Sequence, residues 1–291
     1  MILPEQGEPI VVQGITGKFG SLHAGLMLQY GTNVAAGVTP GRKGEKVVGV
    51  PVYDKVAQAV AETGARCSIV FVPAPYFYSA VEEAILAGIK LVVAITEHVP
   101  IRDELKMIDL ARAHDVTVVG PNTPGVILPS RKIKMGIMPA PSFKAGRVAL
   151  FSRSGTLMYE IANQLTLGGL GQTIALGIGG DPVNGTTMID WFDWVRTRND
   201  IEGVVAVGEI GGDSEERLAR YISETKFPKP IFSYVAGRAA PREKRMGHAG
   251  AIIYGDLGTA DSKISAFRSA GVQVAMTPSE VATLVGRTLN R

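Results

Sequence analysis

Short apolar runs alternate with amphipathic segments of helical length along most of the chain. Residues 9–13, 68–72 and 91–96 are such runs, and the segments between them show the period of helices that face a core on one side. Apolar runs separated by helices are typical of parallel strands that are covered on both faces of their sheet. The pattern therefore predicts an α/β protein with doubly wound parallel sheets.

This alternation occurs twice. The first series predicts strands at 9–13, 33–37, 68–72, 91–96 and 117–119 and helices at 20–30, 55–62, 76–87 and 101–114. A polar, proline-containing stretch at 126–142 interrupts the rhythm and is hairpin-like. The second series predicts strands at 147–151, 173–177, 203–207 and 230–235, helices at 157–166, 186–196 and 214–225, and two closing helices. We expect two doubly wound domains, residues 1–143 and 144–291.

Composition excludes several classes of protein. The 291 residues are 46% hydrophobic and carry a net charge of +3, and no run of Lys and Arg is interleaved with aromatic residues, so nucleic-acid binding has no support. No stretch approaches the ~20 apolar residues of a membrane span, and the N-terminus leads almost directly into a strand. The single cysteine, Cys67, lies in an apolar run and reads as a structural thiol. We expect a cytoplasmic protein.

A glycine-rich turn, 14–20, follows the first predicted strand and opens a helix. In doubly wound domains, this position binds anions because free backbone N–H groups and the helix dipole point outward. The spacing is G-x-x-G-x-x-G, which is neither the dinucleotide fingerprint nor a P-loop. The turn is therefore interpreted either as a phosphate site or as a helix start without a ligand.

The loop after the second strand, 38–46, is basic. A nicotinamide dinucleotide site usually has an acidic residue here, but this chain has Arg42 and Lys43. Two adjacent cations suit a phosphorylated ribose, as in NADP or coenzyme A. A solvated basic turn is the alternative.

The second series has a similar turn at Ser154-Gly155-Thr156, between a strand and a helix. Small residues there leave N–H groups of the first helical turn open to a dianion, although a plain N-cap needs no ligand. The loops 177–182 and 208–212 end neighbouring strands of the same sheet. Loops at the carboxyl ends of parallel strands converge on one crevice, so these segments are expected to meet.

His248 lies in a loop flanked by Gly247 and Gly250 and followed by an apolar run. Such a loop allows backbone and imidazole to approach a bulky reactant, and histidine suits nucleophilic work or proton transfer near neutrality. Glu209, at a strand end, is the carboxylate expected to orient the ring. A histidine nucleophile, an orienting acid and a helix-start cradle predict a phosphohistidine site.

The order of these motifs resembles the succinyl-CoA synthetase α-subunit family over nearly the whole chain. The matching segments are 14–20, 37–41, 71–75, 95–97, 120–122, 152–156, 177–182, 208–212 and 244–253. The resemblance implies a Rossmann-like CoA-binding domain followed by a flavodoxin-like ligase domain with the phosphohistidine loop. It also implies a separate β subunit with an ATP-grasp domain that binds ATP or GTP with Mg²⁺, in an αβ or α2β2 assembly. No metal site is expected on this chain.

The resemblance also implies a reaction. His248 receives a phosphoryl group from the nucleotide, Ser154, Gly155 and Thr156 hold its charge, and Glu209 orients the ring. The phosphoryl group then passes to a small carboxylic acid, giving an acyl phosphate that the CoA thiol attacks. Tyr159 matches a position on the substrate side. The residues that match CoA-binding positions are Thr16, Gly17, Lys18, Phe19, Arg42 or Lys43, Ile95, Thr96, Glu97 and Asn122.

Succinate is the expected acid, and citryl-CoA or malyl-CoA synthetase is the alternative with the same mechanism. The chain departs from the family pattern at Arg42-Lys43, His98 and Thr123, and such departures are compatible with a different acid. From other classes, an NADP-binding oxidoreductase and a non-catalytic CoA-binding module stay open. The glycine spacing argues against the first, and the intact His248 loop with Glu209 argues against the second.

Overall fold

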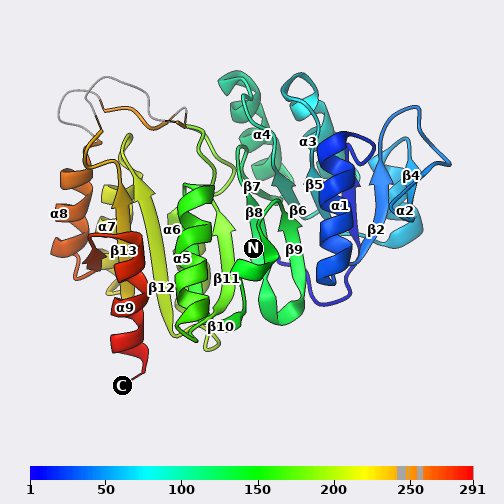
Figure 1. The fold of residues 1–291 in the computed structure, drawn as a ribbon. Helices are drawn as coiled ribbons and strands as arrows, with labels where there is room; N and C mark the ends of the chain where they lie inside the picture. The colour runs from blue at the N-terminus through cyan, green and yellow to red at the C-terminus, as the bar shows by residue number, and fades with distance from the viewer. Residues whose placement is uncertain (241–246, 249, 254–257, 291) are drawn as a thin grey trace. The chain divides into compact units, whose positions relative to one another are not determined.

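A computed structural model describes residues 1–240, 247–248, 250–253 and 258–290. The chain forms two compact units (Figure 1). The first contains residues 1–127, 131–138 and 183–186, and the second contains residues 128–130, 139–182 and 187–291. Each unit alternates strands and helices, as the hydrophobic pattern predicts.

In the first unit the strands are ordered β3-β4-β2-β1-β5-β6-β7. All neighbours run parallel except β3 and β4, which form a short antiparallel pair at the end of the basic loop. This pair was not expected, because Lys46 and Val47 follow a run of charged and glycine residues that favours a loop. The strands are β1 (Ile10–Gln13), β2 (Val34–Val38), β3 (Lys46–Val47), β4 (Val50–Tyr53), β5 (Cys67–Val70), β6 (Leu91–Ala94) and β7 (Thr117–Val119).

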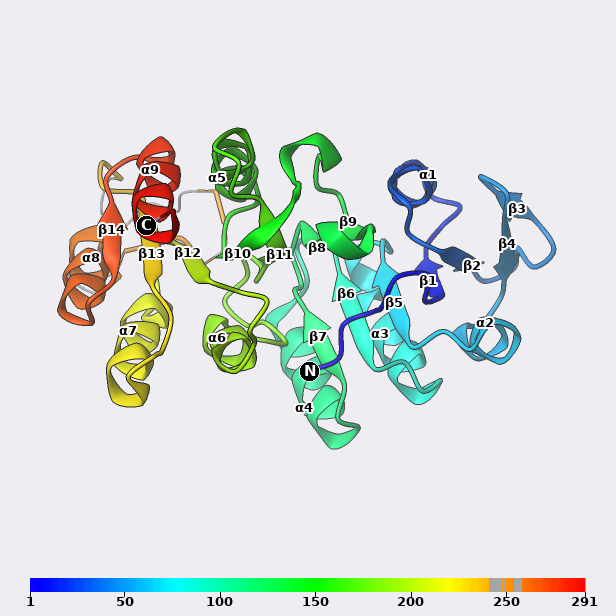
Figure 2. The same ribbon diagram turned by 90° about the horizontal axis from the view of Figure 1, so that it is seen from below.

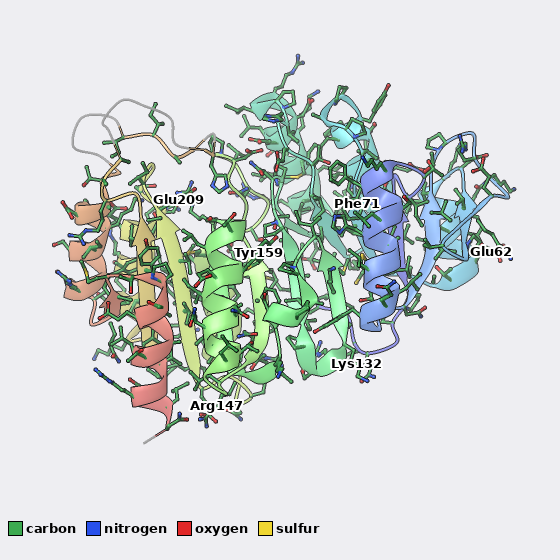
Figure 3. All side chains as sticks on the ribbon, viewed as in Figure 1. Glu62, Phe71, Lys132, Arg147, Tyr159 and Glu209 are labelled. Carbon is green, nitrogen blue, oxygen red and sulfur yellow. The ribbon has the colours of Figure 1, made fainter. Side chains whose placement is uncertain are left out.

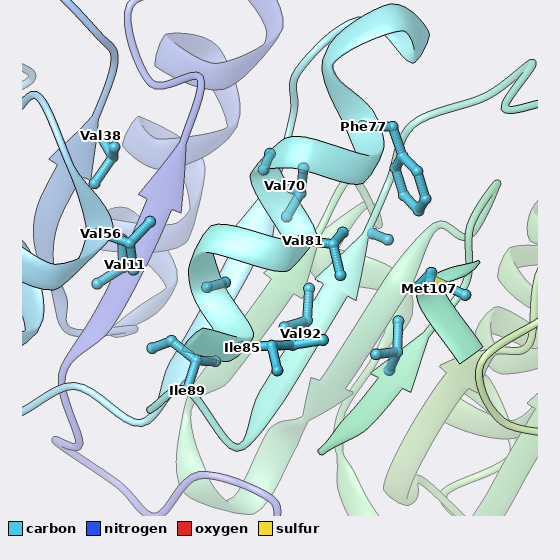
Figure 4. Close-up of a cluster of buried hydrophobic side chains, with 14 of the residues drawn as sticks. Val11, Val38, Val56, Val70, Phe77, Val81, Ile85, Ile89, Val92 and Met107 are labelled. Atoms are coloured by element: carbon cyan, nitrogen blue, oxygen red, sulfur yellow. The ribbon is translucent and has the colours of Figure 1, made fainter. Parts of the chain in front are cut away.

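Helices cover both faces of this sheet (Figure 2). One face carries α1 (Lys18–Tyr30), and the other carries α2 (Val56–Thr63), α3 (Phe77–Leu86) and α4 (Ile101–Ala113). Strands β1, β5 and β6 are buried along their whole length, because helices lie on either side. Figure 4 shows the core between the sheet and α3, where Val81 and Ile85 lie beside Val70 and Val92.

Between the two strand series lies the hairpin-like region. β8 (Gly125–Leu128) and β9 (Ile133–Gly136) are hydrogen-bonded neighbours, with the short 3₁₀ turn η2 (Pro129–Arg131) between them. β9 packs against α1, where Thr32 Oγ1 donates to the Lys134 carbonyl at 3.1 Å. A further 3₁₀ turn, η3 (Ala140–Ser142), precedes the second series, and η1 (Ala74–Tyr76) precedes α3.

In the second unit the strands are ordered β14-β13-β12-β10-β11, all parallel. Helices α5 and α9 lie on one face, and α6, α7 and α8 lie on the other (Figure 2). The strands are β10 (Ala145–Ser152), β11 (Gln172–Gly177), β12 (Gly203–Glu209), β13 (Ile231–Ala236) and β14 (Gln273–Ala275). The helices are α5 (Gly155–Leu167), α6 (Met188–Arg196), α7 (Ser214–Thr225), α8 (Ala260–Ser269) and α9 (Pro278–Leu289).

Both strand orders contain a switch point, where chain connections leave in opposite directions. In the first unit it lies between β1 and β5, and in the second between β10 and β12. Open α/β sheets bind ligands outside the carboxyl ends of their strands at such points. The fold thus predicts one ligand site in each unit. Among the helices that the structure describes, none has the length and apolar character to cross a bilayer.

Candidate active site

Glu209 and His248 meet at the switch point of the second unit. Glu209 is the last residue of β12 and is 6% exposed. Its two carboxylate oxygens lie 3.0 and 2.9 Å from Nδ1 of His248. Figure 3 shows Glu209 at the carboxyl end of its strand. Because the carboxylate accepts from Nδ1–H, the ring is held as the tautomer whose Nε2 carries the lone pair.

Glycines allow the imidazole to lie against backbone. A Cβ built on Gly180 would lie 2.5 Å from Cγ of His248, so any side chain there would displace the ring. The carbonyl of Gly180 also accepts from the N–H of Gly250 at 3.3 Å, which joins the loop after β11 to the loop of His248. The ring is therefore held between the Gly180 backbone and the Glu209 carboxylate.

The electrostatic surroundings raise the pKa of His248 above its ordinary value. The hydrogen bond that the ring donates to Glu209 is the main cause, and the charges of Glu209 and Asp181 act in the same direction. Burial and the positive charge of Arg153 lower it. Arg153 and Asp181 are 7% and 4% exposed, so solvent screens their charges only weakly.

This pKa shift predicts that His248 stabilises the folded chain under mildly acidic conditions. The folded-state pKa exceeds the unfolded value of 6.5, so the stabilisation is complete below that value and is lost as the pH rises through the folded-state pKa. We expect the thermal midpoint of the wild-type chain to exceed that of His248→Asn most at about pH 5.5 and least at about pH 8. A difference that stays constant with pH would contradict the shift.

The start of α5 lies at the same switch point, directly after β10, which pairs with β12. Ser154 is the N-cap, and its hydroxyl accepts from the N–H of Leu157 at 3.4 Å. Neither Gly155 nor Thr156 donates its backbone N–H to a described residue of the chain. The predicted cradle is thus available to an anion through the Gly155 and Thr156 N–H groups, and the Ser154 hydroxyl, which only accepts in the cap, keeps its own O–H as a donor.

Tyr159 lies one turn into α5. Its ring contacts Phe143 edge-on, with 6.4 Å between the ring centroids. Burial raises the pKa of Tyr159 to about 12, so the phenol keeps its proton at neutral pH. Figure 3 places its side chain on α5, within the same unit as Glu209.

A pocket of about 750 Å³ occupies the switch point of the first unit. Residues of the turn after β1 line it, with Thr39 from the end of β2 and Phe71 from the end of β5. Four of the predicted CoA residues are in its wall, namely Thr16, Gly17, Lys18 and Phe19. Gly17, the N-cap of α1, makes no side-chain cap, so the first N–H groups of the helix are open. The turn is so close that a side chain at Gly20 would overlap the Gly14 carbonyl, and glycine is therefore required there.

The remaining predicted CoA residues lie outside the lining of this pocket. Thr96 is linked to the wall, since its hydroxyl donates to the Val72 carbonyl at 2.8 Å, and its own carbonyl accepts from the N–H of Asn122 at 2.8 Å. Ile95 and Glu97 flank it, and Glu97 is exposed. This segment follows β6, at the same edge of the sheet as the pocket.

Arg42 and Lys43 lie in the loop between β2 and β3. Asp54 Oδ1 accepts from the backbone N–H groups of both residues, at 3.0 and 3.1 Å, and fixes the turn. The Arg42 guanidinium also forms an exposed ion pair with Glu45 at 2.6 Å. Among the described residues, Lys43 has no such ion pair, which leaves its ammonium group available to a phosphate.

Four charged residues near Glu209 and His248 were not singled out from the sequence: Arg153, Asp181, Glu215 and Lys263. A signal exists for two of them. Glu215 precedes the buried residues Leu218, Ala219 and Ile222 of α7 at helical spacing, and Lys263 stands between Ala260 and Ile264 of α8. A charge on the apolar face of an amphipathic helix indicates a buried ionic group. No group of three or more His, Cys, Asp or Glu side chains in the described part is placed to hold a metal ion.

Comparison with known families identifies both units. Residues 5–98 match the model of a CoA binding domain, and residues 151–273 match that of a CoA-ligase. The first match contains the pocket after β1, and the second contains Ser154, Glu209 and His248.

Individual proteins match over the full length. The chain is 51% identical over 288 residues to succinate–CoA ligase [ADP-forming] subunit alpha 2 of Archaeoglobus fulgidus, with 99% of each chain covered. It is 50% identical to the corresponding alpha subunit of Aquifex aeolicus, with 99% of this chain and 94% of the other covered. A solved structure of ATP citrate lyase from Methanothrix soehngenii, in complex with citrate and coenzyme A, is 25% identical with a TM-score of 0.90. That match covers 99% of this chain but only 51% of the lyase chain.

Proposed function

The chain belongs to the family of succinate–CoA ligase α subunits, and from that premise we propose that His248 is the phosphoryl carrier of an ADP-forming succinate–CoA ligase. The observation that carries this proposal is the contact of both Glu209 oxygens with Nδ1 of His248, beside the start of α5. This contact leaves Nε2 as the nucleophilic nitrogen.

The geometry supports a two-step transfer. Nε2 attacks the terminal phosphorus of a nucleoside triphosphate, and the N–P bond forms as the P–O bond to the leaving diphosphate breaks. Positive charge that develops on the ring is stabilised by Glu209, and the N–H groups of Gly155 and Thr156 stabilise the phosphoryl oxygens. A carboxylate oxygen of succinate then attacks the same phosphorus, the N–P bond breaks, and His248 returns to its starting state. Bound CoA supplies the thiol that displaces phosphate from the acyl group.

The nucleotide is proposed to bind on a second subunit. The relatives are named as alpha subunits, which implies a partner chain. Neither glycine turn of this chain has P-loop spacing. We therefore place ATP and its Mg²⁺ on a β subunit of ATP-grasp type, in an αβ or α2β2 complex.

Coenzyme A is proposed to bind in the pocket of the first unit. The wall residues from Thr16 to Phe19 and the open start of α1 suit its pyrophosphate, and the segment from Ile95 to Glu97, with Asn122, extends the site along the sheet edge. Of the two cations in the basic loop, Lys43 is assigned to the ribose phosphate because Arg42 is paired with Glu45.

Lys43→Met is expected to weaken CoA binding about tenfold, since a charge-assisted phosphate contact contributes roughly 1.5 kcal/mol or more. Arg42→Met, the matched control, is expected to change binding less than threefold, within the roughly 0–1 kcal/mol of an exposed ion pair. Titration calorimetry with CoA and with dephospho-CoA, which lacks the ribose phosphate, separates the contact from a general charge effect. An equal loss of affinity for both ligands would refute the assignment of Lys43.

The activity itself is tested by thioester formation. The chain is combined with its β subunit, ATP and CoA, and succinate, malate and citrate are compared as acids. We expect succinyl-CoA to be the dominant product. Citryl-CoA formation is the second candidate, because the solved ATP citrate lyase has the same fold over this chain. Preferential citryl-CoA formation would replace succinate in the proposal, and the absence of any thioester would overturn the ligase assignment.

A further inference from the structure

Four buried ionisable side chains form a continuous series of contacts behind His248. Nη2 of Arg153 lies 3.6 Å from Oε1 of Glu209, and its Nη1 lies 3.8 Å from Oε1 of Glu215. The ammonium group of Lys263 pairs with the other oxygen of Glu215 and donates to the Gly212 carbonyl at 3.1 Å. Glu215 and Lys263 are 0% exposed. Side chains from β12, α7, α8 and the segment after β10 therefore form one charged cluster, which is kept from water.

The charges in this series balance only as two pairs. Arg153 lies between two carboxylates, and one guanidinium cannot neutralise both. A buried charge without a counter-charge is costly, so the second carboxylate needs its own cation. Lys263 supplies that cation to Glu215, with Glu216 as a further, partly exposed neighbour at 3.3 Å. Arg153 is then the counter-charge of Glu209.

Arg153 also contacts the backbone that carries the histidine. Its Nη1 donates to the Gly211 carbonyl at 3.2 Å, in the loop directly after Glu209. A Cβ built on Gly250, two residues after His248, would lie 2.9 Å from its Nη2. The guanidinium therefore packs against the backbone on both sides of the imidazole–carboxylate pair, although it does not bind the imidazole itself.

We propose that Arg153 is a positioning residue for His248, and that buried Lys263 directs it to Glu209 by neutralising Glu215. Arg153 fixes the carboxylate and partly offsets its charge. Glu209 then holds the Nδ1 proton without trapping the ring as an imidazolium that has lost its nucleophilic lone pair. The catalytic role of this arrangement rests on the proposed phosphohistidine function. The positions of the four side chains are independent of it.

The proposal predicts opposite responses to opposite charge changes. The charged groups that act on His248 are Glu209 at the end of β12, Asp181 after β11 and Arg153 after β10. Arg153→Met removes the cation and raises the pKa of His248. Lys263→Met also raises the pKa of His248, because the unpaired Glu215 then competes with Glu209 for Arg153. Glu215→Gln removes the competitor and lowers the pKa, and the double variant Lys263→Met/Glu215→Gln returns it close to the wild-type value.

The first measurement uses the chain alone. Carbon-13 labelling of histidine Cε1 gives one NMR titration curve per histidine, and the chain has four. His248→Asn assigns the relevant curve. Lys229→Met is the matched control, because that lysine donates to the carbonyls of Arg198 and Ile201, away from the cluster. The control is expected to leave the His248 curve unchanged, and each variant is first checked for cooperative unfolding.

The second measurement is the pH profile of His248 phosphorylation in the complex with the β subunit. For Lys263→Met and Arg153→Met we expect a rate about tenfold lower on the acid side and near wild-type at high pH, since only the neutral ring reacts. The double variant should recover most of the rate. A purely structural role would lower the rate equally at every pH.

The outcomes separate this proposal from the proposed function. If the His248 titration is the same in folded Lys263→Met and wild-type chains, or if the double variant is no closer to wild type than Lys263→Met, the proposal fails. Lys263→Met and the double variant test the proposal even if Arg153→Met does not fold. If the titration curves shift as expected but the wild-type complex acquires no phosphoryl group, the positioning role stands and the phosphohistidine function fails.

Discussion

His248→Asn is expected to abolish covalent phosphorylation and to lower thioester formation at least about 10³-fold, because the only nucleophile of the proposed transfer is lost. Asparagine retains a polar group of similar reach but has no basic nitrogen to attack phosphorus. The complex is incubated with γ-labelled ATP, and the label is tested for the acid lability and base stability of a phosphoramidate.

His114→Asn is the matched control for this variant, since His114 is exposed at the end of α4 in the other unit. It is expected to retain full labelling. Label that persists in His248→Asn would show that another residue carries the phosphoryl group, and the proposed function would have to be abandoned.

Glu209→Gln is expected to lower the rate of phosphorylation about 10²- to 10⁴-fold, as in other sites where an amide replaces the carboxylate that fixes a histidine tautomer. The amide can donate to Nδ1 and thereby place the proton on Nε2, where it blocks attack. It also removes the negative charge that stabilises the ring after phosphoryl transfer. Single-turnover labelling across a pH series measures the effect.

The sign of the pH dependence separates orientation from simple pKa tuning. Loss of the Glu209 hydrogen bond and charge lowers the pKa of His248, so more of the ring is neutral in mildly acidic solution. If Glu209 only tuned the pKa, the variant would react faster there. We expect a slower reaction at every pH. Glu202→Gln, which removes an exposed ion pair with Arg147 just before β12, serves as the control.

The sequence predicts the architecture well because the hydrophobic pattern is strong. Strands such as β1, β5 and β6 are apolar along their length, since helices bury both faces of the sheet, and each is followed by a turn and an amphipathic helix. The β3–β4 pair does not follow this hydrophobic pattern. It follows a charged, glycine-containing loop, and its strands have two and four residues, too few for a period to be recognised.

The candidate site is predictable in part, for a physical reason. Parallel strands align their carboxyl ends, so the chain order alone brings Ser154, Glu209 and the 177–182 loop to one edge of a sheet. Distances between side chains do not follow from that order. The contact of Glu209 with Nδ1 depends on the glycine at 180, and the role of Arg153 depends on Lys263 of α8, far along the chain.

Gly180 affects how gene copies of this family can be interpreted. Because the imidazole of His248 occupies the space where a Cβ would stand, a working copy is restricted to glycine at residue 180. A duplicated copy released from catalysis is free of that restriction and can acquire alanine or serine there while it still encodes His248. A copy with a larger residue at 180 is therefore expected to be inactive, even when it still encodes the histidine.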